Sequence, residues 1–343
     1  MFAWLRKAVS YVFGGVLRVR HWLYDNGYFK SYTADVPTIC VGNLAVGGTG
    51  KSPIVAALME RFGTRRGAVM LSRGYGRTTR GFRVVRPSSL AREVGDEPLQ
   101  LKLRTPENRV VVCEDRVAGC RQILQEYPDC ELIVLDDAFQ HRRLRSSVNL
   151  LLTRFDNPFS TDFLLPYGRL RDLKCRARYA DAIVVTNVPT QASLTECEQL
   201  AKQLQSYPEQ PVLYSGLCYG EPRSLTGELF ENSALQGNVY GLAGIANPAS
   251  FFEYIATLHE IRDYLTYNDH HRFTRREITL LERIVTHDGW IITTEKDATR
   301  LRELVAPESY LSHRILYIPI HIVWLWESEK KLERILKNEL EKN

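Results

Sequence analysis

The stretch that decides the fold is Ala45-Val46-Gly47-Gly48-Thr49-Gly50-Lys51-Ser52. It follows an apolar run at residues 38–41 with the pattern of a buried strand, and it begins a helical pattern over residues 51–62. A glycine-rich turn between a strand and a helix that ends in Gly-Lys-Ser is typical of a phosphate-binding loop. Ala45 replaces the first glycine of that pattern, which is a minor change because alanine is also small. A glycine-rich turn without a ligand is the alternative, and this context argues against it.

This loop predicts a nucleotide site over residues 45–52. Glycines let backbone N–H groups curl around a phosphate, and the N-terminus of the following helix adds partial positive charge. Lys51 is expected to reach the β- and γ-phosphates, and Ser52 is expected to hold Mg²⁺.

The alternation of apolar runs and helical patterns predicts an α/β fold with a mainly parallel sheet and helices on both faces. Further strands are expected at residues 68–72, 109–113, 132–135, 148–152 and 182–186, and helices at 97–103 and 116–126. Residues 31–211 would form this phosphate-loop domain.

The second half predicts a smaller α/β domain at residues 237–343. Residues 212–236 contain two strand-like runs and several turn residues, which favours a linker that is either irregular or a hairpin. Strands are expected after it at 238–243, 262–266 and 290–294, and helices at 248–258, 274–285 and 327–340. Thr274 and Glu277 have the spacing of a capping box, and the last helix has the charge of a surface helix.

Residues 1–30 have the pattern of a basic amphipathic helix. Its apolar residues recur every three or four positions and fall on one face: Leu5, Val9, Val12, Val16, Val19 and Leu23. The uncharged run at 8–17 is too short to cross a bilayer, and no signal-peptide cleavage site follows it. Such a helix can lie on an anionic membrane surface or pack on the protein's own core, and the pattern supports both equally.

The composition is that of a globular protein, with 343 residues, 44% hydrophobic and 25% charged. It excludes disordered, collagen-like and disulfide-scaffold classes. The seven cysteines form no Cys-x-x-Cys pair, which argues against a zinc or thioredoxin-type site and for a reduced compartment. The net charge of +5 is too small to predict a nucleic-acid partner, and no protein partner is inferred.

An apolar run at residues 132–135 ends in two carboxylates, Asp136 and Asp137. Beside a phosphate loop, such a strand delivers an acid to Mg²⁺, so both are candidate metal ligands. His141 follows in the same loop, where it could contact substrate or nucleotide or simply cap the loop.

Asp96 is the candidate base in the segment Gly95-Asp96-Glu97-Pro98, because a kinase needs a group that accepts the proton of the acceptor hydroxyl. Helix capping is the competing role for an aspartate at this position. His270 or its neighbour His271 could orient a carboxylate, or they could cap a loop. Spacing alone does not bring residues 96 and 270 together, although a cleft between domains would.

Two basic loops could bind anionic groups. Arg73 and Tyr75 follow the strand expected at residues 68–72, and Arg171 lies in a second basic turn. Arginine binds phosphate with two parallel hydrogen bonds, whereas a single exposed arginine is more often simply solvated.

Taken together, these segments resemble the tetraacyldisaccharide 4'-kinase family of lipid A assembly over nearly the whole chain. The combination is specific, although the phosphate loop alone is generic. The matching stretches are Val41–Leu44, Gly47–Pro53, Leu71-Ser72-Arg73-Gly74-Tyr75-Gly76, Gly95–Pro98, Asp136–His141, Leu165-Pro166, Leu170-Arg171, Ala243-Gly244-Ile245, Asp269-His270 and Thr294-Glu295-Lys296-Asp297-Ala298.

The resemblance implies that ATP phosphorylates the 4'-hydroxyl of a tetraacylated glucosamine disaccharide 1-phosphate, a lipid A precursor. It places this reaction on the cytoplasmic face of a bacterial inner membrane, to which the N-terminal helix would bind peripherally. It also implies Asp96 as the base and His270 as its orienting partner, with the smaller domain closing over the nucleotide.

Three positions depart from the family pattern. Ala138 replaces a usual glycine, Tyr167-Gly168-Arg169 replaces a small Ala-Gly-Pro stretch, and Asp172 replaces a usual glutamate. The details of this loop therefore stay open.

Three other functions compete with a lipid kinase. A soluble small-molecule kinase would work without membranes and without residues 1–25. A nucleotide-dependent switch needs a guanine-specificity motif, and Glu295-Lys296-Asp297 and Thr186-Asn187-Val188-Pro189 do not supply one. A membrane scaffold that only binds nucleotide would show no turnover.

Overall fold

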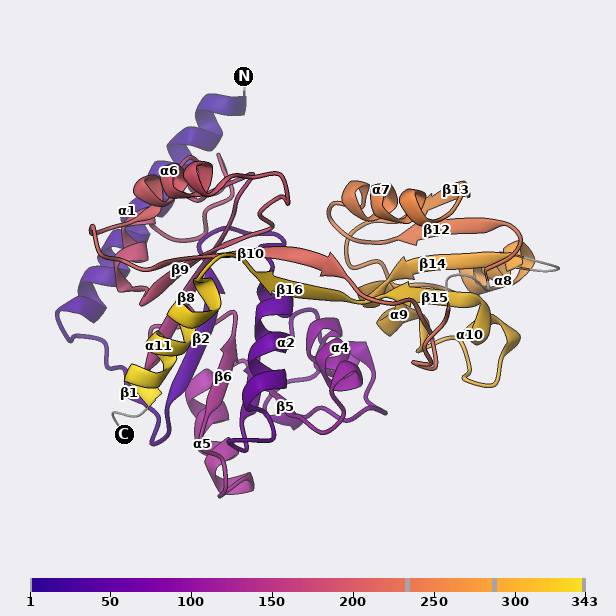
Figure 1. Ribbon diagram of the computed structural model, residues 1–343. Helices are drawn as coiled ribbons and strands as arrows, with labels where there is room; N and C mark the ends of the chain where they lie inside the picture. The colour runs from indigo at the N-terminus through magenta and orange to yellow at the C-terminus, as the bar shows by residue number, and fades with distance from the viewer. Residues whose placement is uncertain (1, 232–234, 286–288, 341–343) are drawn as a thin grey trace.

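The computed structural model describes residues 2–231, 235–285 and 289–340, and it consists of two α/β domains joined by a pair of strands (Figure 1). The expected linker at 212–236 and the expected domains at 1–30 and 237–343 therefore lie partly outside the described residues. In the described part of the chain, the larger domain is built on a sheet of nine strands and the smaller on a sheet of five.

The larger sheet is parallel throughout its interior, as predicted. Only its edge pairs, β16 with β10 and β4 with β5, are antiparallel. In spatial order the strands are β16 (Ile320–Trp324), β10 (Val212–Tyr219), β9 (Ala182–Thr186), β8 (Val148–Arg154), β2 (Thr38–Asn43), β6 (Ile133–Asp136), β3 (Val69–Ser72), β5 (Arg109–Val112) and β4 (Arg83–Val84).

Helices cover both faces of this sheet, which is why its central strands are continuous apolar runs. Successive residues of β2 point to opposite faces: Ile39 and Val41 pack in the core that includes residues of α2 and α11, and Cys40 packs in the core that includes residues of α5. The helices of this domain are α2 (Lys51–Phe62), α3 (Ala91–Val94), α4 (Asp96–Arg104), α5 (Arg116–Glu126), η1 (Lys174–Tyr179), α6 (Leu194–Leu204) and α11 (Ser328–Leu340). A short parallel pair, β1 (Tyr32–Thr33) with β7 (Leu144–Arg145), lies apart from the sheet.

The smaller sheet has the order β11-β15-β14-β12-β13 and is also mainly parallel. The predicted capping box is confirmed, because Thr274 and Glu277 exchange hydrogen bonds at the start of α8. Its elements are β11 (Arg223–Ser224), β12 (Val239–Ala243), α7 (Ala249–Leu258), β13 (Ile261–Thr266), α8 (Arg275–Val285), β14 (Trp290–Thr294), α9 (Glu295–Leu301), α10 (Tyr310–Arg314) and β15 (Ile315–Ile318).

The connection between the domains includes the expected linker at residues 212–236, but β10 does not pair with the next strand, β11, as a hairpin would require. The first part of β10 pairs with β9 in the larger sheet, and its outer part pairs with β16, about a hundred residues later in the chain. After β16 the chain returns to the larger domain, where α11 buries Leu332 and Leu336 in the main core. The last segment, β16 and α11, therefore belongs to the larger domain and not to the smaller domain expected at residues 237–343. The sequence did not predict this, because strand pairing over such a distance leaves no local sequence pattern.

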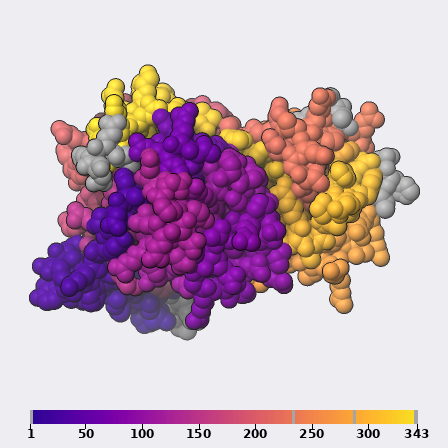
Figure 2. All heavy atoms as spheres, turned by 90° about the horizontal axis from the view of Figure 1, so that it is seen from below, coloured from indigo at the N-terminus to yellow at the C-terminus, as the bar shows by residue number. Residues whose placement is uncertain are grey.

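The N-terminal helix α1 (Phe2–Asp25) turns its apolar stripe away from the protein. Val12 is 69% exposed and Val16 is 60% exposed, whereas the polar side chains of Ser10 and His21 are buried. Figure 2 shows this segment (indigo) projecting from one side of the larger domain. Packing of the stripe on the protein's own core is therefore ruled out. Among the described residues, no helix is long and apolar enough to cross a membrane.

Candidate active site

The phosphate loop lies between β2 and α2, as predicted. Gly47 (φ +103°) and Gly50 (φ +75°) adopt left-handed conformations that a side chain would strain, so the loop depends on glycine at both positions. The side chain of Asn43, at the end of β2, donates a hydrogen bond to Thr49 Oγ1 (2.7 Å). Since β2 has β6 on one side and β8 on the other, the loop lies at the point where the strand order reverses, where ligands bind in such sheets.

Asp136 ends β6 directly beside β2 and is buried. Its Oδ2 accepts a hydrogen bond from Ser72 Oγ (2.9 Å), while its buried Oδ1 has no hydrogen-bond partner among the described residues. Burial raises the pKa of this carboxyl, and the nearby charges of Glu97 and Asp137 raise it further. An unpaired buried carboxylate oxygen beside a phosphate loop is suited to a cation.

Asp137 is held by cations of this chain. Both of its oxygens accept hydrogen bonds from Arg171, and Lys51 Nζ lies 3.8 Å from Oδ1. Burial opposes ionisation, but the hydrogen bond from Arg171 and the charge of Lys51 lower the pKa of Asp137 below its ordinary value. Arg171 also donates to Asn43 Oδ1 (2.5 Å), so the basic turn at residues 166–172 is tied directly to the nucleotide loop.

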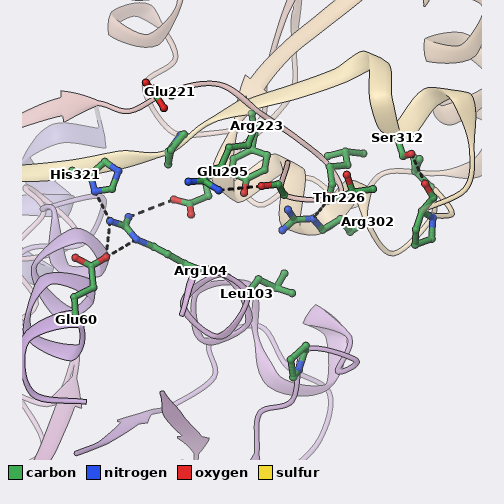
Figure 3. Close-up of a pocket in the computed structure, with 17 residues that line it drawn as sticks. Glu60, Leu103, Arg104, Glu221, Arg223, Thr226, Glu295, Arg302, Ser312 and His321 are labelled. Atoms are coloured by element: carbon green, nitrogen blue, oxygen red, sulfur yellow. Dashed lines mark hydrogen bonds and ion pairs between the residues drawn. The ribbon is translucent and has the colours of Figure 1, made fainter. Parts of the chain in front are cut away.

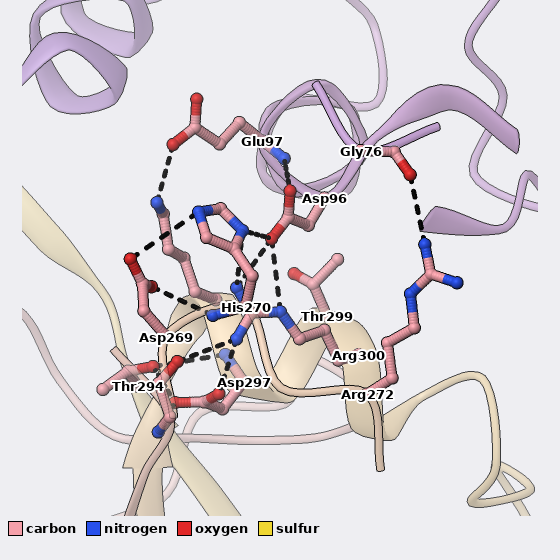
Figure 4. Close-up of polar contacts among 12 residues, drawn as sticks. Gly76, Asp96, Glu97, Asp269, His270, Arg272, Thr294, Asp297, Thr299 and Arg300 are labelled. Atoms are coloured by element: carbon pink, nitrogen blue, oxygen red, sulfur yellow. Dashed lines mark hydrogen bonds and ion pairs between the residues drawn. The ribbon is translucent and has the colours of Figure 1, made fainter. Parts of the chain in front are cut away.

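Asp96 and His270 meet across the domain boundary (Figure 4). Asp96 begins α4 of the larger domain, and His270 follows β13 of the smaller domain in a left-handed conformation (φ +58°). His270 Nδ1 lies 2.9 Å from Asp96 Oδ2. This hydrogen bond raises the pKa of His270, although burial opposes the effect. The docking of the two domains thus brings these distant residues into direct contact.

His271 does not join this pair. Its Nε2 lies 2.9 Å from Glu277 Oε1 at the start of α8. The adjacent histidines point to different partners, so His271 has the capping role and His270 faces the carboxylate.

The other candidate substrate residues make no hydrogen bond to Asp96 or His270 among the described contacts. Tyr75 is exposed, and its ring centroid lies 5.8 Å from that of His270, whereas Arg73 is exposed near the buried Arg116. Burial lowers the pKa of His141 to about 4, helped by the charge of Arg116, and its buried Nε2 has no partner among the described residues. His141 is therefore neutral at physiological pH and available as a hydrogen-bonding group.

Several polar residues of the site were not among the predicted site residues. Lys296 Nζ lies 2.6 Å from Glu97 Oε1, and Arg300 Nη2 lies 2.6 Å from Asp96 Oδ2. Both cations belong to α9 of the smaller domain. The segment Thr-Glu-Lys-Asp-Ala that precedes Arg300 was a visible motif, but its partners lie about 200 positions earlier in the chain.

The loop at residues 163–172 also carries a buried pair. Asp172 is one of the positions that depart from the family pattern. Its Oδ1 lies 2.6 Å from Nε2 of His21 in α1. Both side chains are almost completely buried. The N-terminal helix is thus attached to the loop that holds Arg171.

A cavity of about 730 Å³ lies between the domains near the opposite end of α4 (Figure 3). Arg104, the last residue of α4, bonds Glu60 of α2 and His321 of β16 there, and Glu295 lies 3.8 Å away. Its lining residues come from both domains, so the cavity is part of the joint between them. None of the predicted site residues lines it.

Comparison with known proteins identifies the family. A family model described as tetraacyldisaccharide-1-P 4'-kinase matches residues 2–341. The chain is 40% identical to the tetraacyldisaccharide 4'-kinase of Cytophaga hutchinsonii, over 91% of this chain and 89% of the relative. It is 34% identical to that of Bacteroides thetaiotaomicron, over 95% and 90%.

A solved structure agrees with this result. The crystal structure of LpxK from Aquifex aeolicus in complex with ATP superposes with a TM-score of 0.79 at 26% identity, covering 99% of this chain and 100% of that one. With the fold, the phosphate loop and the sequence relatives all in agreement, the chain belongs to the tetraacyldisaccharide-1-P 4'-kinase family.

Proposed function

We propose that this chain carries out the reaction of its family with Asp96 as the proton acceptor. The reaction transfers the γ-phosphate of ATP to the 4'-hydroxyl of a tetraacylated glucosamine disaccharide 1-phosphate in lipid A synthesis. The observation that carries the assignment of the base is the 2.9 Å contact between Asp96 and His270, made from two domains. A carboxylate that is buried and oriented by histidine is a suitable base for a sugar hydroxyl.

In this mechanism the 4'-hydroxyl oxygen attacks the γ-phosphorus, and the bond from that phosphorus to the β–γ bridging oxygen breaks. The hydroxyl proton passes to the Asp96 carboxylate. Backbone N–H groups of residues 45–52 and the Lys51 ammonium bind the ATP phosphates and stabilise the charge that develops on them. Arg171 orders the loop beneath them through Asp137 and Asn43.

The residues present fit a bound Mg²⁺. Ser52 and Asp136 would hold it, because Asp136 Oδ1 is a buried oxygen without a partner among the described residues. Asp137 suits direct coordination less well, since Arg171 occupies both of its oxygens. When bound, Mg²⁺ neutralises charge on the β- and γ-phosphates. So few protein ligands are normal for Mg²⁺, which keeps several of its waters.

The acceptor is proposed to bind where the two domains meet, beside Asp96 and His270. Tyr75 is exposed beside His270, and Arg73 is exposed two residues earlier in the same loop, so they can contact the sugar and phosphate of the lipid. His141 lies in the loop after β6, where its neutral imidazole can donate or accept a hydrogen bond from substrate.

The N-terminal helix is proposed to place the enzyme on the cytoplasmic face of the inner membrane. Its apolar stripe is exposed, and its basic residues suit anionic headgroups. Its opposite side holds the loops that carry Arg171 and His141, because Ser10 donates to the carbonyl of Leu164 and Arg20 to that of Gln140. A lipid lying in the membrane would therefore meet the site at the membrane surface.

The test measures phosphate transfer from ATP to the tetraacyl disaccharide 1-phosphate in mixed micelles. We expect transfer by the wild type and a strong loss of kcat for Asp96→Asn, with ATP binding retained. Asp263→Asn, at an exposed position of β13, is the matched control and should keep full activity. An unchanged kcat for Asp96→Asn would remove Asp96 from the mechanism.

A further inference from the structure

Among the described residues, Arg300 makes more contacts with the proposed base than any other cation. Its Nη2 and Nε lie 2.6 Å and 3.2 Å from Asp96 Oδ2. It comes from α9 in the smaller domain, whereas Asp96 begins α4 in the larger domain. Both side chains are at least nine-tenths buried. An ion pair so well shielded from water is strongly directional, and the loss of either partner would leave a buried charge.

The guanidinium of Arg300 is itself fixed from behind (Figure 4). Its Nη1 donates to Asp297 Oδ1 and to the carbonyl of Gly244, both at 3.0 Å. Asp297 is completely buried, and its Oδ2 accepts from the Gly244 amide (2.9 Å) and from Thr294 Oγ1 (2.7 Å). The ends of β12 and β14 therefore lock Arg300 in one orientation, with its outer edge presented to Asp96.

These contacts give the two carboxylate oxygens of Asp96 different hydrogen-bond partners. Oδ2 accepts from Arg300 and from His270, so its lone pairs are committed. Oδ1 accepts the backbone amide of Glu97 at the longer distance of 3.2 Å. The more available oxygen for a substrate proton is therefore Oδ1.

We propose that Arg300 is a positioning residue of the phosphotransfer reaction, which holds Asp96 from the smaller domain so that Oδ1 faces the acceptor hydroxyl. This inference rests on the proposed role of Asp96 as base. It means that the base has its working orientation only when the smaller domain is docked, because β12, β14 and α9 supply the clamp.

The charges around Asp96 agree with this role. His270 faces it from the loop after β13, Arg300 and Lys296 face it from α9, and Glu97 faces it from its own helix. Burial opposes ionisation, but the hydrogen bond from His270 and the charge of Arg300 hold the pKa of Asp96 well below its usual range. Removal of Arg300 would raise this pKa, so the carboxylate would become protonated, and inactive as a base, at higher pH.

The test compares Arg300→Ala, Arg300→Lys and Asp96→Asn. For Arg300→Ala we expect a fall in kcat of about 100-fold, typical of a misplaced catalytic group, with little change in the KM for ATP. The acidic limb of the kcat–pH profile should move to higher pH. Millimolar guanidinium chloride should restore part of the activity. Lysine cannot span Asp96 and Asp297 with a planar fork, so Arg300→Lys should recover only part of kcat.

The matched control is Arg302→Ala, two positions along the chain. Arg302 donates to the carbonyl of Leu225 and lies over the ring of Tyr317, so its loss also weakens the smaller domain. Arg302→Ala should have the same kcat–pH profile as the wild type, and added guanidinium chloride should not change its activity.

The outcomes separate the two proposals. If Asp96→Asn keeps its kcat, the proposed base is wrong, and the inference about Arg300 falls with it. If Asp96→Asn is inactive but folded Arg300→Ala and Arg300→Lys keep the wild-type kcat and acidic limb, the assignment of Arg300 alone is overturned. A loss of kcat with an unmoved limb and no guanidinium rescue also overturns it, since it indicates a purely structural role.

Discussion

The exposed stripe of α1 allows a quantitative prediction for membrane binding. We consider the double change Val12→Ser and Val16→Ser, at positions 69% and 60% exposed. Full burial of a valine side chain is worth about 1.5 kcal/mol, so burial of the exposed two-thirds in a membrane contributes about 1 kcal/mol per residue. Removal of both therefore costs about 2 kcal/mol, or roughly 30-fold in affinity for vesicles.

The assay is co-sedimentation with anionic phospholipid vesicles over a range of lipid concentration. Serine has nearly the same helix propensity as valine, so the helix itself should persist. Leu280→Ser is the matched control, because Leu280 is 47% exposed on α8 of the smaller domain. We expect this control to bind vesicles like the wild type. Equal vesicle affinity for the double variant and the wild type would refute the argument that this stripe enters the membrane.

Three further predictions concern the nucleotide loop, the N-terminal helix and the pair formed by Asp96 and His270. Lys51→Ala should lower kcat on the order of 100-fold through the loss of one phosphate-binding cation, measured as phosphate transfer in micelles; near-normal kcat would contradict the role of the loop. His21→Ala should destabilise the protein by about 3 kcal/mol in urea unfolding, because it leaves the Asp172 carboxylate buried without its partner; a loss no larger than that of an exposed substitution would contradict this. The raised pKa of His270 means that its pair with Asp96 stabilises the fold fully below the ordinary histidine pKa of about 6.5, and that this contribution is lost as pH rises through the raised value. Asp96→Asn should therefore flatten the alkaline fall of Tm, and an unchanged slope would show that the pair does not supply it.

The features of the fold that could be predicted from sequence are local ones. The strand, glycine loop and helix around Lys51 are contiguous, and each is specified by neighbouring residues. The strands β9 and β14 and the helices α2 and α5 have the predicted bounds, because their hydrophobic patterns are uninterrupted. A linker was predicted at residues 212–236, but the pairing of β10 with β16 was not, because these strands lie about a hundred residues apart in the chain.

The candidate site shows the same division. Asp136 and Asp137 could be predicted because they directly follow a buried strand next to the phosphate loop. The clamp of Arg300 on Asp96 could not, because 204 positions separate the two residues and two different sheets place them. The role of His271 was equally open until its contact with Glu277 distinguished it from His270.

The sequence by itself determined that this chain binds a nucleotide, that it has an α/β core, and that its first helix is amphipathic, since each follows from residues close together in the chain. Only the tertiary structure decided which way that helix turns. Ser10 and His21 are buried against the loops at residues 164 and 172, so Val12 and Val16 are left to face outward. It also decided that Asp96, the proposed base, meets its partners His270 and Arg300 across the two domains, because a hydrogen bond depends on distances in space, and spacing along the chain does not set them.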